Sequence, residues 1–123
     1  MEAQIRVADL ARLADSAERV TQRLLDHASG ATTCTVILIK TPPGDGSPEG
    51  LHTHAVDQHF YVLAGTLSVE FGGDVHHARE GALVHIPAGV PHRNWNGGDS
   101  AAVFLAINAP VPDPREPFAQ RVG

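Results

Sequence analysis

The chain has 123 residues, with 14 acidic and 9 basic side chains, a formal net charge of −5 and 42% hydrophobic residues. This length suits one domain and leaves no room for two independent cores. The acidic balance argues against a surface that follows nucleic-acid phosphates, and no window approaches the roughly 20 apolar residues of a membrane helix. The N-terminus carries charges throughout and lacks the apolar stretch of a secretory signal, so we expect a cytoplasmic protein without nucleic-acid or membrane partners.

The first third of the chain reads as a short helix followed by a hairpin. Residues 8–28 hold good helix formers, but the part from 19 onward also alternates between apolar and polar positions. We predict a helical turn near 8–14 and a strand over about 19–26, joined through Ser29 and Gly30 to the next strand.

Short apolar runs separated by turn residues dominate the middle of the chain. Twelve glycines and nine prolines divide runs rich in Val, Ile, Leu, Thr and Phe at 33–40, 59–65, 66–71, 82–87 and 102–108. Runs of this length between such turns are typical of antiparallel strands. Residues 66–71 alternate between polar and apolar side chains, as in a strand with one solvent-exposed face, whereas residues 33–40 are apolar on both faces. The pattern predicts an all-β barrel.

The C-terminal residues have a different composition. Positions 110–123 contain four prolines, at Pro110, Pro112, Pro114 and Pro117. Proline donates no backbone hydrogen bond, so this stretch is not a central strand and is predicted to be an extended arm. We expect residues 1–123 to form one domain, with a barrel core over about 19–109.

Two closely spaced histidines and a glutamine suggest a metal site. His52 and His54 lie two residues apart, so on a strand both imidazoles point to the same face and can share one ion. Gln58 keeps that parity and is followed on the same side by Phe60 and Val62. The Gln58 oxygen would then be a ligand next to an apolar wall of the site.

A third histidine stands far along the chain. His92 follows the turn at 87–91 and begins another run, in which Asn94 shares its parity. Spacing alone does not bring His92 beside His52. Asn94 and Phe104, together with Phe60 and Val62, are the candidate walls of a substrate pocket.

Two motifs in the chain resemble the signatures of the cupin superfamily. The first signature, G(X)5HXH(X)3,4E(X)6G, is matched except that glutamine replaces glutamate, and the second, G(X)5PXG(X)2H(X)3N, is matched in full. The matching residues are Gly46, His52, His54, Gln58 and Gly65 in the first motif and Gly81, Pro87, Gly89, His92 and Asn96 in the second. Fifteen residues separate the two motifs, as in a minimal cupin.

This resemblance implies a fold and a ligand set. The fold would be an antiparallel jelly-roll β-barrel, often dimeric, with the two motifs on facing hairpins and one divalent metal ion between them. The ligands would be His52, His54, Gln58 and His92. Fe, Mn, Zn, Ni and Cu all remain open as the metal, since histidine-rich sites suit each of them. We expect a homodimer in which the N-terminal segment and the C-terminal arm form the interface.

The glutamine at position 58 changes the expected chemistry. With no carboxylate ligand, a divalent ion and its ligands would keep a charge near +2, which lowers affinity and raises Lewis acidity. This favours lyase, isomerase or hydrolytic chemistry slightly over redox chemistry, and bacterial hydroxynitrile lyases of this superfamily carry a similar set of ligands. His59 is the alternative fourth ligand, although its strand parity is opposite to that of Gln58.

Three functions compete on this basis. The first is a metal-dependent enzyme for a small molecule, acting as a dioxygenase or as a lyase or isomerase, with catalytic residues beyond the ligands unassigned. The second is a non-catalytic module that binds or senses a small carboxylate or sugar. The third is a storage or structural barrel held together by its metal. His85 is a further candidate as a proton shuttle if its side of the strand faces the cavity.

Overall fold

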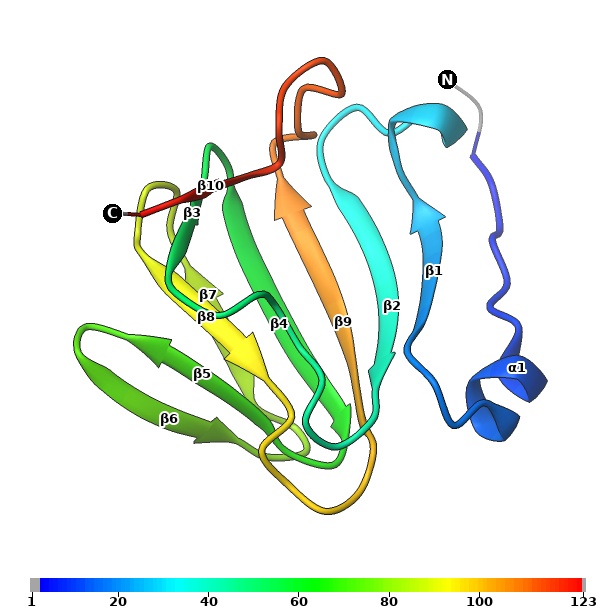
Figure 1. Ribbon diagram of the computed structural model, residues 1–123. Helices are drawn as coiled ribbons and strands as arrows, with labels where there is room; N and C mark the ends of the chain where they lie inside the picture. The colour runs from blue at the N-terminus through cyan, green and yellow to red at the C-terminus, as the bar shows by residue number, and fades with distance from the viewer. Residues whose placement is uncertain (1–2, 123) are drawn as a thin grey trace.

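A computed structural model describes residues 3–122 and contains two facing antiparallel sheets of five strands each (Figure 1). The first sheet has the order β1-β2-β9-β4-β7 and the second the order β10-β3-β8-β5-β6. The strands of the first sheet are β1 (Val20–Leu25), β2 (Thr35–Thr41), β9 (Ala102–Ala109), β4 (Asp57–Ala64) and β7 (Leu83–Ile86). Those of the second are β10 (Ala119–Arg121), β3 (His52–His54), β8 (His92–Trp95), β5 (Leu67–Phe71) and β6 (Asp74–Ala78). The predicted all-β architecture is confirmed.

The N-terminal prediction is also confirmed. Helix α1 (Leu10–Asp15) begins after Asp9, whose carboxylate accepts a hydrogen bond from the backbone N–H of Arg12 and so caps the helix. Strand β1 follows, and a 3-10 turn, η1 (His27–Ser29), leads to Gly30 in the left-handed conformation. Because α1 is short and has no buried residue, its position depends on tertiary contacts.

Polar contacts hold α1 beside β1, at the edge of the first sheet (Figure 1). The ammonium group of Lys40 on β2 donates to the backbone oxygens of Leu13 and Ser16, near the helix end. The side chain of Gln22 on β1 exchanges two hydrogen bonds with the backbone of Asp9, at 2.8 and 3.0 Å. Among residues 3–122, no helix is long and apolar enough to cross a membrane.

The hydrophobic core lies between the two sheets. Alternate residues of β4 and β9 are buried, as expected for strands with one inward face. Phe60 and Phe104 meet edge to face, with ring centroids 5.3 Å apart. The core cluster consists of Ile39, Phe60, Val62, Leu67, Val69, Ile86, Phe104 and Ala106. Burial of each large apolar side chain contributes about 1.5–3 kcal/mol to stability.

Two glycines of the first motif are required by close backbone approaches. A Cβ atom at Gly46 would lie 2.4 Å from the backbone oxygen of Asn94, since the loop before β3 pairs with β8 at this point. Gly65 has a φ of +71°, and a Cβ atom there would lie 2.3 Å from the backbone oxygen of Ala101. These positions therefore fix the loop over the barrel mouth and the end of β4.

The C-terminal arm ends in a strand that the sequence did not predict. After the proline-rich stretch, β10 pairs antiparallel with β3, and the backbone N–H of Val122 donates to Leu51. The arm thus crosses to the edge of the second sheet, where Figure 1 shows β10 beside β3. The last residues of this arm are paired because β3 has an open edge on that side.

Candidate metal centre

The three histidines of the two motifs come together inside the barrel. His52 and His54 lie on β3 and His92 on β8, where His52 and His92 are direct partners in the ladder. The ring centroids are 4.4 to 4.9 Å apart, and one ring nitrogen of each histidine lies within 4.8 Å of the others. His54 and His92 are buried, and His52 is half-buried. This geometry suits three ligands of one ion.

Backbone carbonyls hold two of these rings. The Nδ1 atom of His54 lies 2.9 Å from the backbone oxygen of Phe118, and Nδ1 of His92 lies 2.9 Å from that of Val90. A proton on Nδ1 satisfies each contact and leaves Nε2 with its lone pair free. Contacts of this kind fix the tautomer and orientation of metal-binding histidines.

Gln58 on β4 completes the cluster from the facing sheet. Its amide nitrogen donates to Asn108 Oδ1 at 3.0 Å, and the amide nitrogen of Asn108 donates to Thr35 Oγ1 at 3.1 Å. This chain leaves Gln58 Oε1 directed at His92 Nε2, 3.2 Å away. All four side chains are buried, so their orientations are set by these contacts.

The arrangement around His92 fits a bound cation. With the Gln58 amide oriented as in the structure, a carbonyl oxygen faces each ring nitrogen of His92, but a neutral imidazole has one N–H. The second contact then joins two acceptors. A metal ion bound to both Nε2 and Oε1 would remove that conflict, so the donor set fits a divalent transition metal.

The electrostatic environment keeps the three rings neutral. Burial, followed by the neighbouring His92 and His54, lowers the pKa of His52 to about 4. Burial also lowers the pKa values of His54 and His92, against the backbone hydrogen bonds that raise them. Neutral imidazoles are the form that binds metal.

The lowered pKa of His52 predicts a pH dependence of stability for the metal-free protein. The ordinary value is 6.5 and the folded value about 4, so the unfolded chain binds the proton first as pH falls. The stability that depends on a neutral His52 is complete above pH 6.5 and is lost progressively as the pH falls toward 4. Thermal unfolding in a chelator at pH 7.5 and pH 5 measures it. The His52→Ala variant should lose less stability between these values than the wild type, and an equal loss would contradict the prediction.

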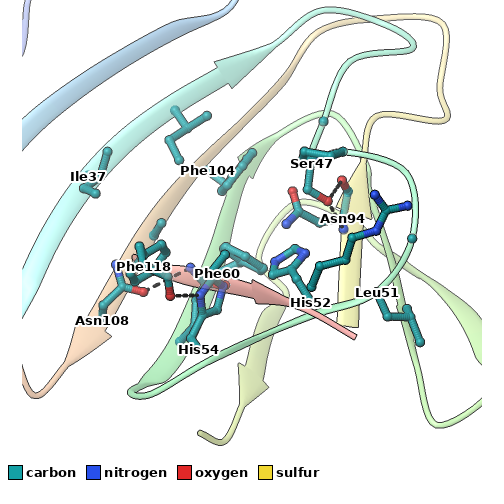
Figure 2. Close-up of a pocket in the computed structure, with 18 of the residues that line it drawn as sticks. Ile37, Ser47, Leu51, His52, His54, Phe60, Asn94, Phe104, Asn108 and Phe118 are labelled. Carbon is teal, nitrogen blue, oxygen red and sulfur yellow. Dashed lines mark hydrogen bonds between the residues drawn. The ribbon is translucent and has the colours of Figure 1, made fainter. Parts of the chain in front are cut away.

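His52, His54 and Gln58 form the floor of a cavity of about 490 Å³, within the usual range for small-molecule sites. His92 is fully buried next to them. Phe60, Asn94 and Phe104 line this cavity, as Figure 2 shows together with Ile37 and Leu51. Val62 was grouped with these walls on parity, but the structure places it in the hydrophobic core with 1% of its surface exposed. Parity correctly gave its inward direction but not its depth.

The other two histidines of interest lie outside the barrel. His59 on β4 and His85 on β7 are cross-strand partners whose rings stack, with their Nδ1 atoms 3.0 Å apart. His59 therefore points away from the cluster of His52, His54 and His92. Val84 and Ile86 carry the inward face of β7, which removes the basis for His85 as a proton shuttle in the cavity.

Several residues at the site were missed by sequence reasoning. Asn108 is a polar residue on the inward face of an otherwise apolar strand, and that parity was a usable signal. Phe118 stacks on His54 with a centroid distance of 4.1 Å, but nothing in the proline-rich tail indicates this contact. Arg19 and Arg121 also line the cavity from the two ends of the chain.

Comparisons with known proteins agree with this fold. A mannose-1-phosphate guanylyltransferase of Salmonella montevideo is 32% identical over 71 residues, 58% of this chain but 15% of that enzyme. The polyketide cyclase RemF of Streptomyces resistomycificus superimposes with a TM-score of 0.71 at 23% identity, covering 86% of this chain and 72% of the cyclase. An RmlC-like cupin of Methanocaldococcus jannaschii gives 0.73 at 19% identity, covering 94% and 95%.

These two structural likenesses show the fold, and the curated relative shares only a small part of its length with this chain. A family model described as the cupin domain matches residues 37–108. That range includes both histidine motifs and more than half of the chain. The chain therefore belongs to the cupin domain family.

Proposed function

We propose that the protein is a metal-dependent enzyme that converts a small organic molecule in the barrel cavity. The observation that carries the proposal is the cluster of three neutral histidines and Gln58 at the floor of a cavity with mostly apolar walls. His52, His54, Gln58 and His92 would hold one divalent ion. The cavity walls would exclude water and orient the substrate.

The ligand set favours lyase or isomerase chemistry over dioxygenation. When bound, the metal would supply Lewis acidity, which a set of four neutral ligands leaves largely undiminished. The hydrogen-bond chain through Asn108 and Thr35 would keep the Gln58 oxygen directed inward during turnover. A structural neighbour that is a polyketide cyclase supports an enzymatic role, because the same barrel carries an enzyme there.

The proposal is tested by elemental analysis of protein purified without a histidine tag. We expect about one transition-metal ion per chain. The outward pair His59 and His85 is a possible second binding place, so the His59→Ala, His85→Ala double variant serves as the matched control and should keep that ion. If neither the purified nor the reconstituted protein holds a metal, the enzyme proposal fails, and a metal-free binding barrel for a small carboxylate or sugar takes its place.

We also propose that the protein forms a homodimer through its N-terminal segment. Ile5, Val7 and Leu10 are 94%, 84% and 68% exposed, an unusual display of large apolar side chains in one short segment. The Ile5→Ser, Val7→Ser double variant should be a monomer in light scattering after size exclusion, whereas the wild type should be a dimer. Val75→Ser, at an exposed residue of β6, is the control and should remain dimeric. A monomeric wild type would contradict the proposal.

A further inference from the structure

The cavity carries a positive charge although the whole chain is acidic. Its charged lining residues are Arg19, Arg121 and Glu49, which leaves a net charge of +1 on a protein whose formal charge is −5. Every inward polar side chain near the histidines is neutral, including Gln58 and Asn94. A divalent ion at the floor would add to this positive potential and to the attraction for an anion.

Arg121 is placed beside the candidate metal centre by strand pairing. It is the direct partner of His52 in the β10–β3 ladder, as Ala119 is of His54. Paired residues project from the same face of a sheet, with Cβ atoms about 4.5–5.5 Å apart. The guanidinium group lies next to the backbone of the loop before β3, where Nε and Nη2 are 3.7 Å from a Cβ position built on Gly50. Arg121 therefore stands at the cavity mouth above His52.

The cavity arginines have no acidic partner in the described part of the chain. The salt bridge found within residues 3–122 joins Arg115 and Asp113, on the irregular part of the C-terminal arm. Among residues 3–122, neither Arg19 nor Arg121 has a carboxylate oxygen within 4.0 Å, and Glu49 makes no such contact with them. A guanidinium group without a carboxylate can take a carboxylate ligand in a two-pronged contact.

The other residues that line the cavity indicate the chemistry of the rest of the ligand. Ile37, Phe60, Phe104 and Leu51 supply an apolar wall between the mouth and the histidines. The backbone N–H of Asn94 donates to Ser47 Oγ at 3.0 Å, and Ser47 Oγ donates to the backbone oxygen of Asn94 at 2.9 Å. These bonds do not use the side-chain amide of Asn94, which is therefore available to a ligand. A molecule that fills this cavity needs an apolar body with one polar end toward the mouth.

We infer that the substrate or ligand is a small organic carboxylate, whose carboxylate group is bound by Arg121 while its apolar body reaches toward the histidines. This inference rests on the proposed function for the use of the site, but Arg121 acts on the anion whether or not a metal is bound. It assigns Arg121 as a specificity-determining residue of the C-terminal arm.

The test is calorimetric binding of benzoate and 4-methylpentanoate, each compared with its neutral amide, to zinc-loaded and chelator-treated protein. We expect each acid to bind at least about tenfold more tightly than its amide, since an ionised hydrogen bond is roughly twice as strong as a neutral one. Arg121→Gln should remove most of that preference in the chelator-treated protein, reduce it in the zinc-loaded protein, and leave amide binding and metal content unchanged.

Arg115→Gln is the matched control, because it removes the same charge from the same arm away from the cavity. It should leave the preference for the acid intact. Equal binding of acid and amide, or an equal loss in the two arginine variants, would overturn the inference. A wild type that binds the acid through Arg121 but holds no metal would instead overturn the metal-dependent proposal alone.

Discussion

Replacement of His52 by alanine is expected to abolish metal binding at micromolar metal concentrations. Loss of a ligand should cost more than the roughly 10- to 100-fold in affinity that removal of an outer hydrogen-bond partner costs. His52 is half-buried at the cavity floor, so its replacement leaves room for water and not an unpaired buried charge. The affinity is measured by competition with a chromophoric chelator at pH 7.5.

Gln58→Ala should weaken metal binding without abolishing it, since the three imidazoles remain and a neutral amide oxygen is the weakest of the four proposed ligands. The variant also leaves Asn108 Oδ1 without its donor, so its thermal stability must be measured in parallel. His85→Ala is the control for the loss of a histidine, because that ring lies on the outer face. An affinity equal to that of the wild type in His52→Ala would remove His52 from the ligand set.

Removal of residues 114–123 has the second largest expected effect. The truncated chain loses the carbonyl of Phe118 that holds His54 Nδ1, and it loses the strand paired with β3. His54 then becomes free to rotate and to change tautomer, so we expect metal affinity to fall by about 10- to 100-fold. Chelator competition on protein shown to be folded by circular dichroism measures the change.

A point substitution separates the carbonyl from the aromatic ring. Phe118→Ala keeps the backbone oxygen and removes only the ring that stacks on His54. Its affinity should lie within about threefold of the wild type, because the hydrogen bond that fixes the tautomer remains. If this variant loses as much affinity as the truncated chain, the stacking of Phe118 and not its carbonyl positions His54.

Much of the site was predictable because strand periodicity is a local property. Side chains two residues apart on a strand share a face, which was enough to place His52 and His54 together on β3. Gln58 lies on β4 of the facing sheet, so its place beside them depends on how the two sheets pack. The glycines of the two motifs likewise follow from backbone conformation and close contact, as Gly65 shows. The fold class and the shared face of His52 and His54 therefore follow from the sequence by itself.

Only the tertiary structure decided how deeply a side chain is buried, which residues it contacts and which distant strands pair. Periodicity gave Val62 the right face, but only the packing of two sheets decided that it lies in the core and not at the cavity. The pairing of β10 with β3 brings Phe118 and Arg121 to histidines more than sixty residues earlier in the chain. Such a contact depends on the edge that the folded sheet leaves open, and an open edge is a property of the assembled strands that no local pattern encodes.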